Sequence, residues 1–273
     1  RAPRAHDRIT TPAPSIARIM SATRRPLGAA GITLCFARIG GFTPQRIFPT
    51  LVRMKPIREL ARLPSPFPKP QGIHADGTTL WVSSRATRRV YALDPASLHV
   101  TWETPSPEGL VTWGLTKVGA ELRAVVGGEG GPADIRSIRR CLPGQGFDPG
   151  FRWSVPEDAG SHLSHDGHHL VLSQWYPKKL LFLDQAGRVE RMITVPRGIA
   201  GQCFAEGCFY LVTTDREETD EYFLTRVDPR GYEPEGADVA RVPFPARGLA
   251  HDGRDFWTNH REANQIVRFA RPA

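Results

Sequence analysis

The sequence predicts an all-β fold in which five four-stranded units form a ring, a five-bladed β-propeller. Three observations predict it. The 273-residue chain is divided by 25 prolines and 26 glycines into short segments, apolar residues alternate within most of them, and one hairpin pattern recurs five times. Alternating apolar residues are typical of half-buried strands. Many short strands separated by glycine and proline indicate an all-β domain.

The repeated hairpin is clearest from Arg247 to Phe269, where two apolar strands flank a turn at Asp252-Gly253 and a third strand follows a polar loop. The turn glycines of the five hairpins are separated by 42, 48, 40 and 46 residues: Gly77, Gly119, Gly167, Gly207 and Gly253. A period in the forties with about four strands per unit is the spacing of propeller blades.

The strands after the turn recur from unit to unit. The strand after the turn reads LWVSS, LRAVV, LVLSQ, FYLVT and FWTNH, and the third strand reads RRVYALD, DIRSIRR, KLLFLD, YFLTRVD and QIVRFA. A fourth, outer strand ends near a proline in the first four units, at Pro105, Pro156, Pro196 and Pro243. A six-bladed ring and a different closure are the alternatives. A β-sandwich would account for the strands but not for their common spacing.

The last unit lacks a fourth strand, and the segment from Ile57 to Pro64 has the form of one. We therefore expect the N-terminal strand to complete the last blade and close the ring, because closure removes exposed sheet edges. The predicted propeller domain spans residues 54–273, which gives 44 residues per unit.

Residues 1–53 lie outside the repeat and are predicted to be a leader. They contain nine Arg, no Lys and one acidic residue, Asp7, and so carry the whole net charge of +8. This composition resembles a transit peptide, and Arg24-Arg25 before the apolar run Leu27 to Phe36 resembles a degenerate export signal. The alternative is a disordered tail, or sequence upstream of a start at Met54.

The predicted domain itself carries no net charge, since residues 54–273 contain 27 basic and 27 acidic side chains. A nucleic-acid partner requires a basic face on the folded domain, so we predict none. We find no run of about 18 apolar residues and predict no membrane partner. We expect a soluble monomer and favour the cytoplasm over export, although the sequence leaves the compartment open.

The four cysteines, Cys35, Cys141, Cys203 and Cys208, do not have the spacing of zinc ligands. Pairing around the turn at Gly207 places Cys203 opposite Tyr210, so the thiols of Cys203 and Cys208 lie diagonally, which is poor disulfide geometry. We predict free, buried thiols.

The units resemble the propeller superfamily that includes NHL-type repeats, streptogramin lyase, gluconolactonase-like proteins and glutaminyl cyclases. Glutaminyl cyclases of this type open on a Gln-Gly-Leu strand, which Gln71-Gly72-Ile73 matches. Their next strand carries a catalytic Glu in a pattern like Leu-Phe-Glu-Ser-Thr, and Val82 stands at that position here. Because Val82 cannot transfer a proton, this departure argues against pyroglutamate-forming chemistry.

The resemblance to gluconolactonase-like enzymes implies a divalent metal held by Glu, Asn and Asp just before the Gly-Leu of successive inner strands. The corresponding residues here are Gln71, Trp113, Ser161, Gly201 and Arg247. None of them is a carboxylate, the ligand that a hard cation prefers. We therefore predict no metal and no cofactor.

The resemblance also implies that two sets of loops surround one mouth of the central channel. The first set supplies Gln71, Trp113, Ser161 or His162, Gln202 and Arg247, and the second supplies Arg85, Glu129, Trp175, Asp215, Asn259 and His260. Aromatic walls with a few polar groups suit a small molecule or a peptide end. The predicted ligand-binding residues are Gln71, Trp113, Trp175, Gln202, Arg247 and His260.

Three functions are open at this point. The first is a non-catalytic binding propeller, in which Arg247 pairs with an anionic group and Trp113 stacks on a flat or apolar body. The second is a diverged cyclase-like or lyase/lactonase-like enzyme that uses Glu129 or His260 for proton transfer. The third is a scaffold for a protein partner, with the Trp175 loop as a contact.

A purely structural interpretation is also open for the same residues. In it, Arg247 pairs with Glu129 or Asp215 as an ion pair at the rim, and Trp113 fills the narrow channel as a wedge.

Overall fold

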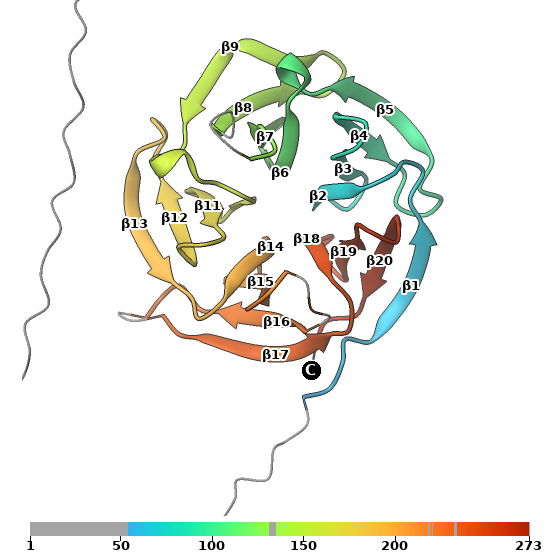
Figure 1. Ribbon diagram of the computed structural model, residues 1–273, viewed down its shortest axis with the longest axis vertical. Coiled ribbons are helices and arrows are strands. Elements are labelled where there is room, and N and C mark those ends of the chain that lie inside the picture. Colours follow the sequence, from blue (N-terminus) through green and yellow to red (C-terminus); the bar gives the residue numbers. More distant parts are fainter. Residues whose placement is uncertain (1–53, 131–134, 218, 220, 232–233, 273) are drawn as a thin grey trace, which may run out of the picture. The chain divides into compact units, whose positions relative to one another are not determined.

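The computed structural model describes residues 54–130, 135–217, 219, 221–231 and 234–272. The predicted leader lies outside these residues. The described chain forms five four-stranded antiparallel sheets around a central axis (Figure 1), which confirms the five-bladed prediction. Among the described residues, no helix is long and apolar enough to cross a membrane.

In the first four blades the strands follow one another from the axis to the rim (Figure 1). Blade 1 contains β2 (Pro70–Ala75), β3 (Leu80–Ser84), β4 (Arg89–Leu93) and β5 (Val100–Pro105). Blade 2 contains β6 (Val111–Val118), β7 (Glu121–Gly127), β8 (Ser137–Leu142) and β9 (Gly146–Ser154). Blade 3 contains β10 (Leu163–His165), β11 (Leu170–Gln174), β12 (Lys179–Leu183) and β13 (Val189–Thr194). Blade 4 contains β14 (Gly198–Ala205), β15 (Cys208–Thr214), β16 (Tyr222–Val227) and β17 (Gly236–Val242). Short 3-10 turns, η1 (Pro107–Gly109) and η3 (Pro156–Asp158), follow the outer strands of blades 1 and 2.

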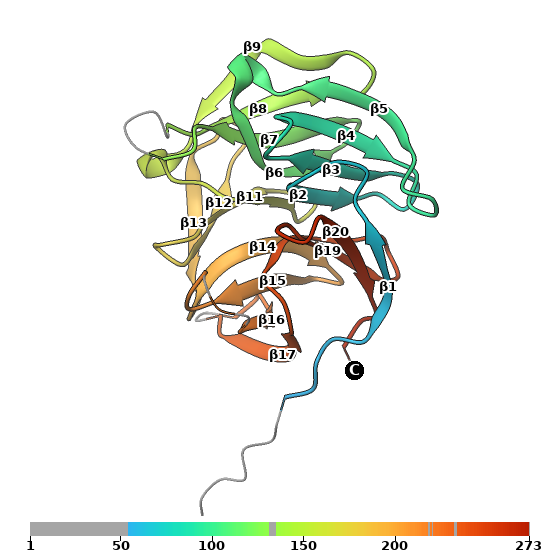
Figure 2. The same ribbon diagram turned by 45° about the vertical axis from the view of Figure 1, so that its right-hand side comes forward.

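The fifth blade combines the last three strands with the first one. It contains β18 (Ala246–His251), β19 (Phe256–His260), β20 (Gln265–Phe269) and the outer strand β1 (Glu59–Pro64). Arg62 lies opposite Val267 in the β1–β20 pair, and Figure 2 shows β1 running beside blade 5. The predicted closure by the N-terminal strand is therefore confirmed.

The N-terminal segment also ties blade 5 to blade 4. We predicted a strand from Ile57, but β1 begins at Glu59, and the residues before it bridge to β17 instead. The Ile57 backbone N–H donates to the Arg241 carbonyl at 2.8 Å, and the Arg241 N–H donates to the Lys55 carbonyl at 2.9 Å. These bonds cover part of the edge that β17 would otherwise expose.

Tight turns join the first two strands of every blade. The five predicted turn glycines all have positive φ, from 61° at Gly119 to 100° at Gly167, a region that glycine enters without steric cost. In blade 5 the turn is also held by a carboxylate, since Asp252 Oδ1 accepts hydrogen bonds from the backbone N–H groups of Arg254 and Asp255. The turn at Gly207 has the predicted register, with Cys203 opposite Tyr210.

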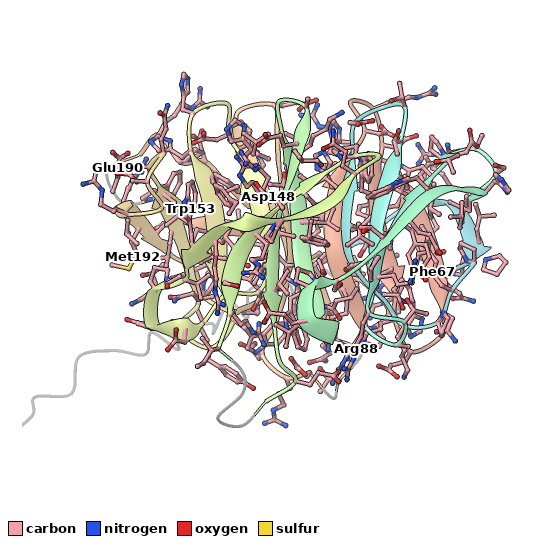
Figure 3. All side chains as sticks on the ribbon, turned by 90° about the horizontal axis from the view of Figure 1, so that it is seen from above. Phe67, Arg88, Asp148, Trp153, Glu190 and Met192 are labelled. Carbon is pink, nitrogen blue, oxygen red and sulfur yellow. The ribbon has the colours of Figure 1, made fainter. Side chains whose placement is uncertain are left out.

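Apolar side chains fill the spaces between neighbouring blades, and each of five clusters lies at one such interface. Between blades 4 and 5, for example, Tyr222 packs with Phe256 and Phe269, all fully buried. Burying one such side chain stabilises the fold by about 1.5–3 kcal/mol. Figure 3, in which the ring is seen edge-on, shows Met192 pointing outward from the rim, where it is half exposed.

Close packing at the axis requires glycine. A Cβ atom on Gly72 would lie 2.9 Å from the Gly114 Cα, and one on Gly201 would lie 2.4 Å from the Gly248 carbonyl carbon. The inner strands β2, β6, β14 and β18 all have a register shift near this level. Because such bulges redirect neighbouring side chains, the residues that precede these glycines can turn toward one mouth of the channel.

The three described cysteines, Cys141, Cys203 and Cys208, are free and buried, as predicted. Burial raises the pKa of the Cys141 thiol to about 12. This thiol is therefore unreactive near neutral pH, since the thiolate is the nucleophile.

Candidate functional site

A pocket of about 330 Å³ opens at one mouth of the channel, with residues from all five blades in its wall. It adjoins a shallower depression that contains Arg88, and Figure 3 shows Arg88 at one face of the ring. We name it the arginine pocket, because four arginines line it. Its lining residues are Gln71, Arg85, Trp113, Glu129, Gly130, Arg136, Asp158, Ala159, Gly160, Ser161, His162, Trp175, Tyr176, Pro177, Ala200, Glu217, Arg247 and Arg261.

Five of the predicted site residues meet in this pocket: Gln71, Trp113, Glu129, Trp175 and Arg247. They come from blades 1, 2, 3 and 5. Gln71, Trp113 and Arg247 each precede an axial glycine, and Glu129 and Trp175 lie in loops between second and third strands. The structure thus brings the two predicted sets of loops together at one mouth. Their roles in ligand binding stay predictions.

Arg247 lies at the start of β18, and its side chain is only 7% exposed. Its guanidinium donates hydrogen bonds to the Tyr222 hydroxyl at 2.5 Å and to the Ala246 carbonyl at 3.1 Å, and it lies 5.7 Å from the Trp175 ring centroid. The carboxylate that approaches it is Glu217, whose Oε2 is 3.7 Å from Nη2 and whose side chain is half exposed. Arg247 is therefore a buried cation with mostly neutral hydrogen-bond partners.

The predicted ion pair of Arg247 with Glu129 or Asp215 is wrong. Glu129 binds Arg85 and Arg88 instead, and Asp215 binds Arg197 at 3.1 Å. Each of these two carboxylates already has a guanidinium within hydrogen-bond distance, Arg85 for Glu129 and Arg197 for Asp215, and so neither pairs with Arg247.

A second arginine, Arg261, lies partly buried in the turn after β19. Its side chain is 13% exposed, and its Nη1 donates to the Gln71 Oε1 at 2.9 Å while Nε donates to Glu262 Oε1 at 3.0 Å. Burial, followed by the nearby Arg247 guanidinium, lowers the pKa of Arg261. The two guanidiniums thus repel one another at one side of the pocket.

His162 occupies the axial position that glycine fills in blades 1, 2 and 5, and it is 5% exposed. Burial, together with Arg247, Arg136 and Arg261, lowers the pKa of His162 to about 3. The imidazole is therefore neutral at physiological pH. The same three cations indicate a positive electrostatic potential at this part of the wall.

Trp113 lies between two cations. The Arg136 guanidinium is 4.3 Å and the Arg85 guanidinium 5.4 Å from its ring centroid, while its Nε1 donates to the Gly128 carbonyl at 3.1 Å. Such contacts are favourable because the aromatic face is electron-rich. Trp113 accordingly holds arginines at the mouth, and the wedge interpretation and the stacking interpretation both stay predictions.

Glu129 is the predicted acid/base candidate that does reach the pocket. Hydrogen bonding by Arg85, supported by the charge of Arg88, lowers the pKa of Glu129. The carboxylate is therefore ionised at neutral pH and cannot donate a proton as a general acid.

Two predicted ligand-binding residues do not line the arginine pocket. The His260 ring stacks on Phe244, with centroids 5.3 Å apart. Gln202 Nε2 donates to the His162 and Val171 carbonyls at 3.2 and 2.6 Å, and its side chain faces the other end of the channel. Because Gln202 lies one position after the axial Gly201, it points the opposite way from Arg247, which precedes Gly248.

At that other end is a smaller cavity of about 100 Å³, which we name the histidine cavity after His74, His165 and His251 in its wall. The Gln202 Oε1 and the Ser164 Oγ are buried there without a hydrogen-bond partner. Among the described residues, no group of three or more His, Cys, Asp or Glu side chains could hold a metal ion.

Four residues of the arginine pocket region were missed by sequence reasoning: Arg136, Glu217, Tyr222 and Arg261. Arg261 directly follows the predicted His260 and belongs to a loop that we had placed at the mouth. The others have no repeat position that would single them out.

Comparisons with known proteins support the fold. No family model and no curated protein sequence matches this chain. Among solved structures, the glutaminyl cyclase of Myxococcus xanthus is similar at a TM-score of 0.57 and 17% identity, over 79% of this chain and 99% of that one. Regucalcin, a calcium-binding protein of Agrobacterium tumefaciens, gives a TM-score of 0.49 at 12% identity, over 79% and 95%. Virginiamycin B lyase of Staphylococcus aureus gives 0.45 at 11%, over 77% and 98%.

Of these three, the glutaminyl cyclase has a TM-score above 0.5, and it supports the β-propeller fold that the repeats indicated. At these identities the likeness shows the fold alone, because one fold hosts many functions.

Proposed function

We propose that the arginine pocket binds a small molecule or peptide end through a carboxylate or similar planar anion that pairs with Arg247 and Arg261. The observation that carries the proposal is a pair of mutually repelling guanidiniums in one wall, of which Arg247 is buried and Arg261 is partly buried. A buried charge is costly unless it is paired, and an anion between the two would relieve the repulsion. Guanidinium groups bind carboxylates through two parallel hydrogen bonds.

The surroundings support an anionic ligand over a cationic one. The nearby His162 is neutral, so it adds a hydrogen-bonding group without a charge of its own. Glu217 and Glu262 are each about half exposed, so both can turn toward solvent when an anion enters. Glu129 is already paired with Arg85 and Arg88.

The proposal is for binding without turnover. A general acid must release a proton near working pH, whereas Glu129 is held ionised and His162 is held neutral, so neither supplies one. Val82, at the position of the catalytic Glu in the cyclases that the repeats resemble, is fully buried in the apolar cluster between blades 1 and 5.

The test compares acids with their amides. Phenylacetate, N-acetylphenylalanine and N-acetylalanine, each beside its amide, would be measured by calorimetry with wild type, Arg247→Ala and Arg261→Ala. We expect each variant to weaken the acids by about 2–4 kcal/mol, roughly 30- to 1,000-fold, and to leave the amides unchanged. The exposed Arg188, which pairs with Asp184 outside the pocket, provides the control Arg188→Ala.

Equal binding of acid and amide by wild type would contradict the proposal. So would Arg247→Ala and Arg261→Ala proteins that bind acids as wild type does. Chemical conversion of a bound compound, followed by mass spectrometry, would favour the enzyme alternative instead.

A further inference from the structure

Tyr176 is the most exposed large hydrophobic residue among those that line the arginine pocket, with 87% of its surface accessible. It lies in the tight turn between β11 and β12, where the Lys178 N–H donates to the Trp175 carbonyl at 3.2 Å. Pro177 follows it and restricts the backbone there. The turn therefore presents the phenol ring to solvent at the rim.

The fold leaves most of this ring exposed to solvent. Within the described part of the chain, Tyr176 has neither a hydrogen bond nor an aromatic or cation–π partner. Large aromatic side chains normally bury most of their surface. A fully presented ring beside a concave pocket is the arrangement expected of a ligand contact.

The other two aromatic residues in the wall are already engaged. The guanidiniums of Arg136 and Arg85 make cation–π contacts with the ring of Trp113. Trp175 packs against the core cluster of blades 4 and 5 and lies beside the Arg247 guanidinium. Of the three, Tyr176 thus offers a ring face without such a contact.

We propose that Tyr176 determines which anions the pocket accepts, by closing over a planar aromatic group of a ligand whose carboxylate is held by Arg247 and Arg261. The ligand class is then an aromatic acid, or a peptide end with an aromatic last residue. This inference rests on the proposed function. A pocket of about 330 Å³ accommodates one ring and one carboxylate.

The chemistry of the contact is specific for flat rings. Aromatic pairs gain energy from offset stacking and edge-to-face geometry beyond what area burial provides. A saturated ring of similar size buries comparable area but lacks the π face. A short aliphatic acid reaches the arginines without reaching Tyr176.

The test uses three acids of equal charge: phenylacetate, cyclohexylacetate and acetate. Their dissociation constants would be measured by calorimetry with wild type, Tyr176→Ala and Tyr176→Phe. We expect Tyr176→Ala to weaken phenylacetate about tenfold, cyclohexylacetate less, and acetate by under about twofold. Tyr176→Phe should keep phenylacetate within about twofold of wild type.

Folding does not confound this test, because Tyr176 is exposed, and the melting temperature of Tyr176→Ala should match wild type. The inference would be overturned if Tyr176→Ala bound phenylacetate as wild type does, or if it bound all three acids more weakly by the same factor. In either case, acid binding that depends on Arg247 would still support the proposed function. Absence of binding of every acid by wild type would overturn both.

Discussion

The same five inner strands build both ends of the channel, yet the two ends differ in chemistry. The arginine pocket has one buried and one partly buried guanidinium and about three times the volume of the histidine cavity, whose wall holds the unpartnered Ser164 Oγ and Gln202 Oε1. The axial glycines lie between them. Residues that precede these glycines, such as Arg247, reach the first end, and residues that follow them, such as His74, reach the second.

The difference shows that the positions of the strands and turns do not determine the chemistry of the two channel ends. The repeat sets where the glycines, turns and strands lie, because each blade must pack against its neighbours. The side chains on either side of each glycine are free of that requirement, and they decide what each end of the channel can bind.

The largest expected effect comes from the glycines that separate the two ends. Gly201→Ala would place a Cβ 2.4 Å from the Gly248 carbonyl carbon, so the backbone of one inner strand must move. Overpacking of this kind costs about 1–3 kcal/mol or more, and we expect about 3 kcal/mol by urea denaturation.

Gly150→Ala is the matched control, because Gly150 is exposed and a Cβ there would meet the Asp148 Oδ1 at 3.3 Å, the end of a flexible side chain. Equal free energies of unfolding for the two variants would show that the axis is looser than the glycine contacts indicate.

The next effect concerns the buried histidines, one at each end. Burial is the main cause that lowers the pKa of His74 to about 4, and burial with Arg247 lowers that of His162 to about 3. On unfolding, each imidazole recovers a pKa near 6.5. As the pH falls below about 6.5, the unfolded chain therefore binds protons that the folded ring does not, and stability is lost until the folded pKa is reached.

The expected slope is up to about 1.4 kcal/mol per pH unit for each histidine between pH 6.5 and about 4.5. His74→Gln and His162→Gln should each lower this slope by the contribution of one imidazole. Unfolding free energies measured across that range, with slopes identical in wild type and both variants, would count against neutral imidazoles at either end.

The smallest effect compares two buried serines. Ser83 Oγ accepts a hydrogen bond from the Gly72 N–H and donates to the Thr112 carbonyl, both at 2.8 Å, whereas Ser164 Oγ has no partner. Ser83→Ala should cost about 1–3 kcal/mol because it leaves buried backbone groups unpaired. Ser164→Ala should change the unfolding free energy by about 0.5 kcal/mol or less. A similar loss in both variants would mean that a molecule in the histidine cavity binds the Ser164 hydroxyl.

The arrangement of strands and turns was predictable from the sequence, because the features that determine it are local. A turn glycine with positive φ, such as Gly253, and the alternation around it mark a hairpin wherever they occur. Even the closure followed from the absence of a fourth strand after Phe269 and the presence of one before Gly72.

The site was predictable only in part, because its interactions cross between blades. Arg247 and Gln71 were found from their repeat positions. Arg261 has the same repeat position as Arg85 and Trp175, directly after the second strand, but its hydrogen bond to Gln71, 190 residues away, is not visible in the repeat. Gln202 was placed at the wrong end because the repeats were aligned on their turn glycines. Gly207 is the second residue of its two-residue turn, whereas Gly119 is the first, so the axial glycine of β14 is Gly201 rather than the residue at position 202.

Closure by β1 also determines the order in which the ring can be completed. β1 precedes its partner β20 by about 200 residues, so during synthesis β1 has no sheet to join until the other three strands of blade 5 have been made. Pairings between such distant segments are slow to form. Once β20 is made, its outer edge is open to the strands of other chains until β1 pairs with it, and the risk of mispairing is concentrated in the interval just before the ring closes.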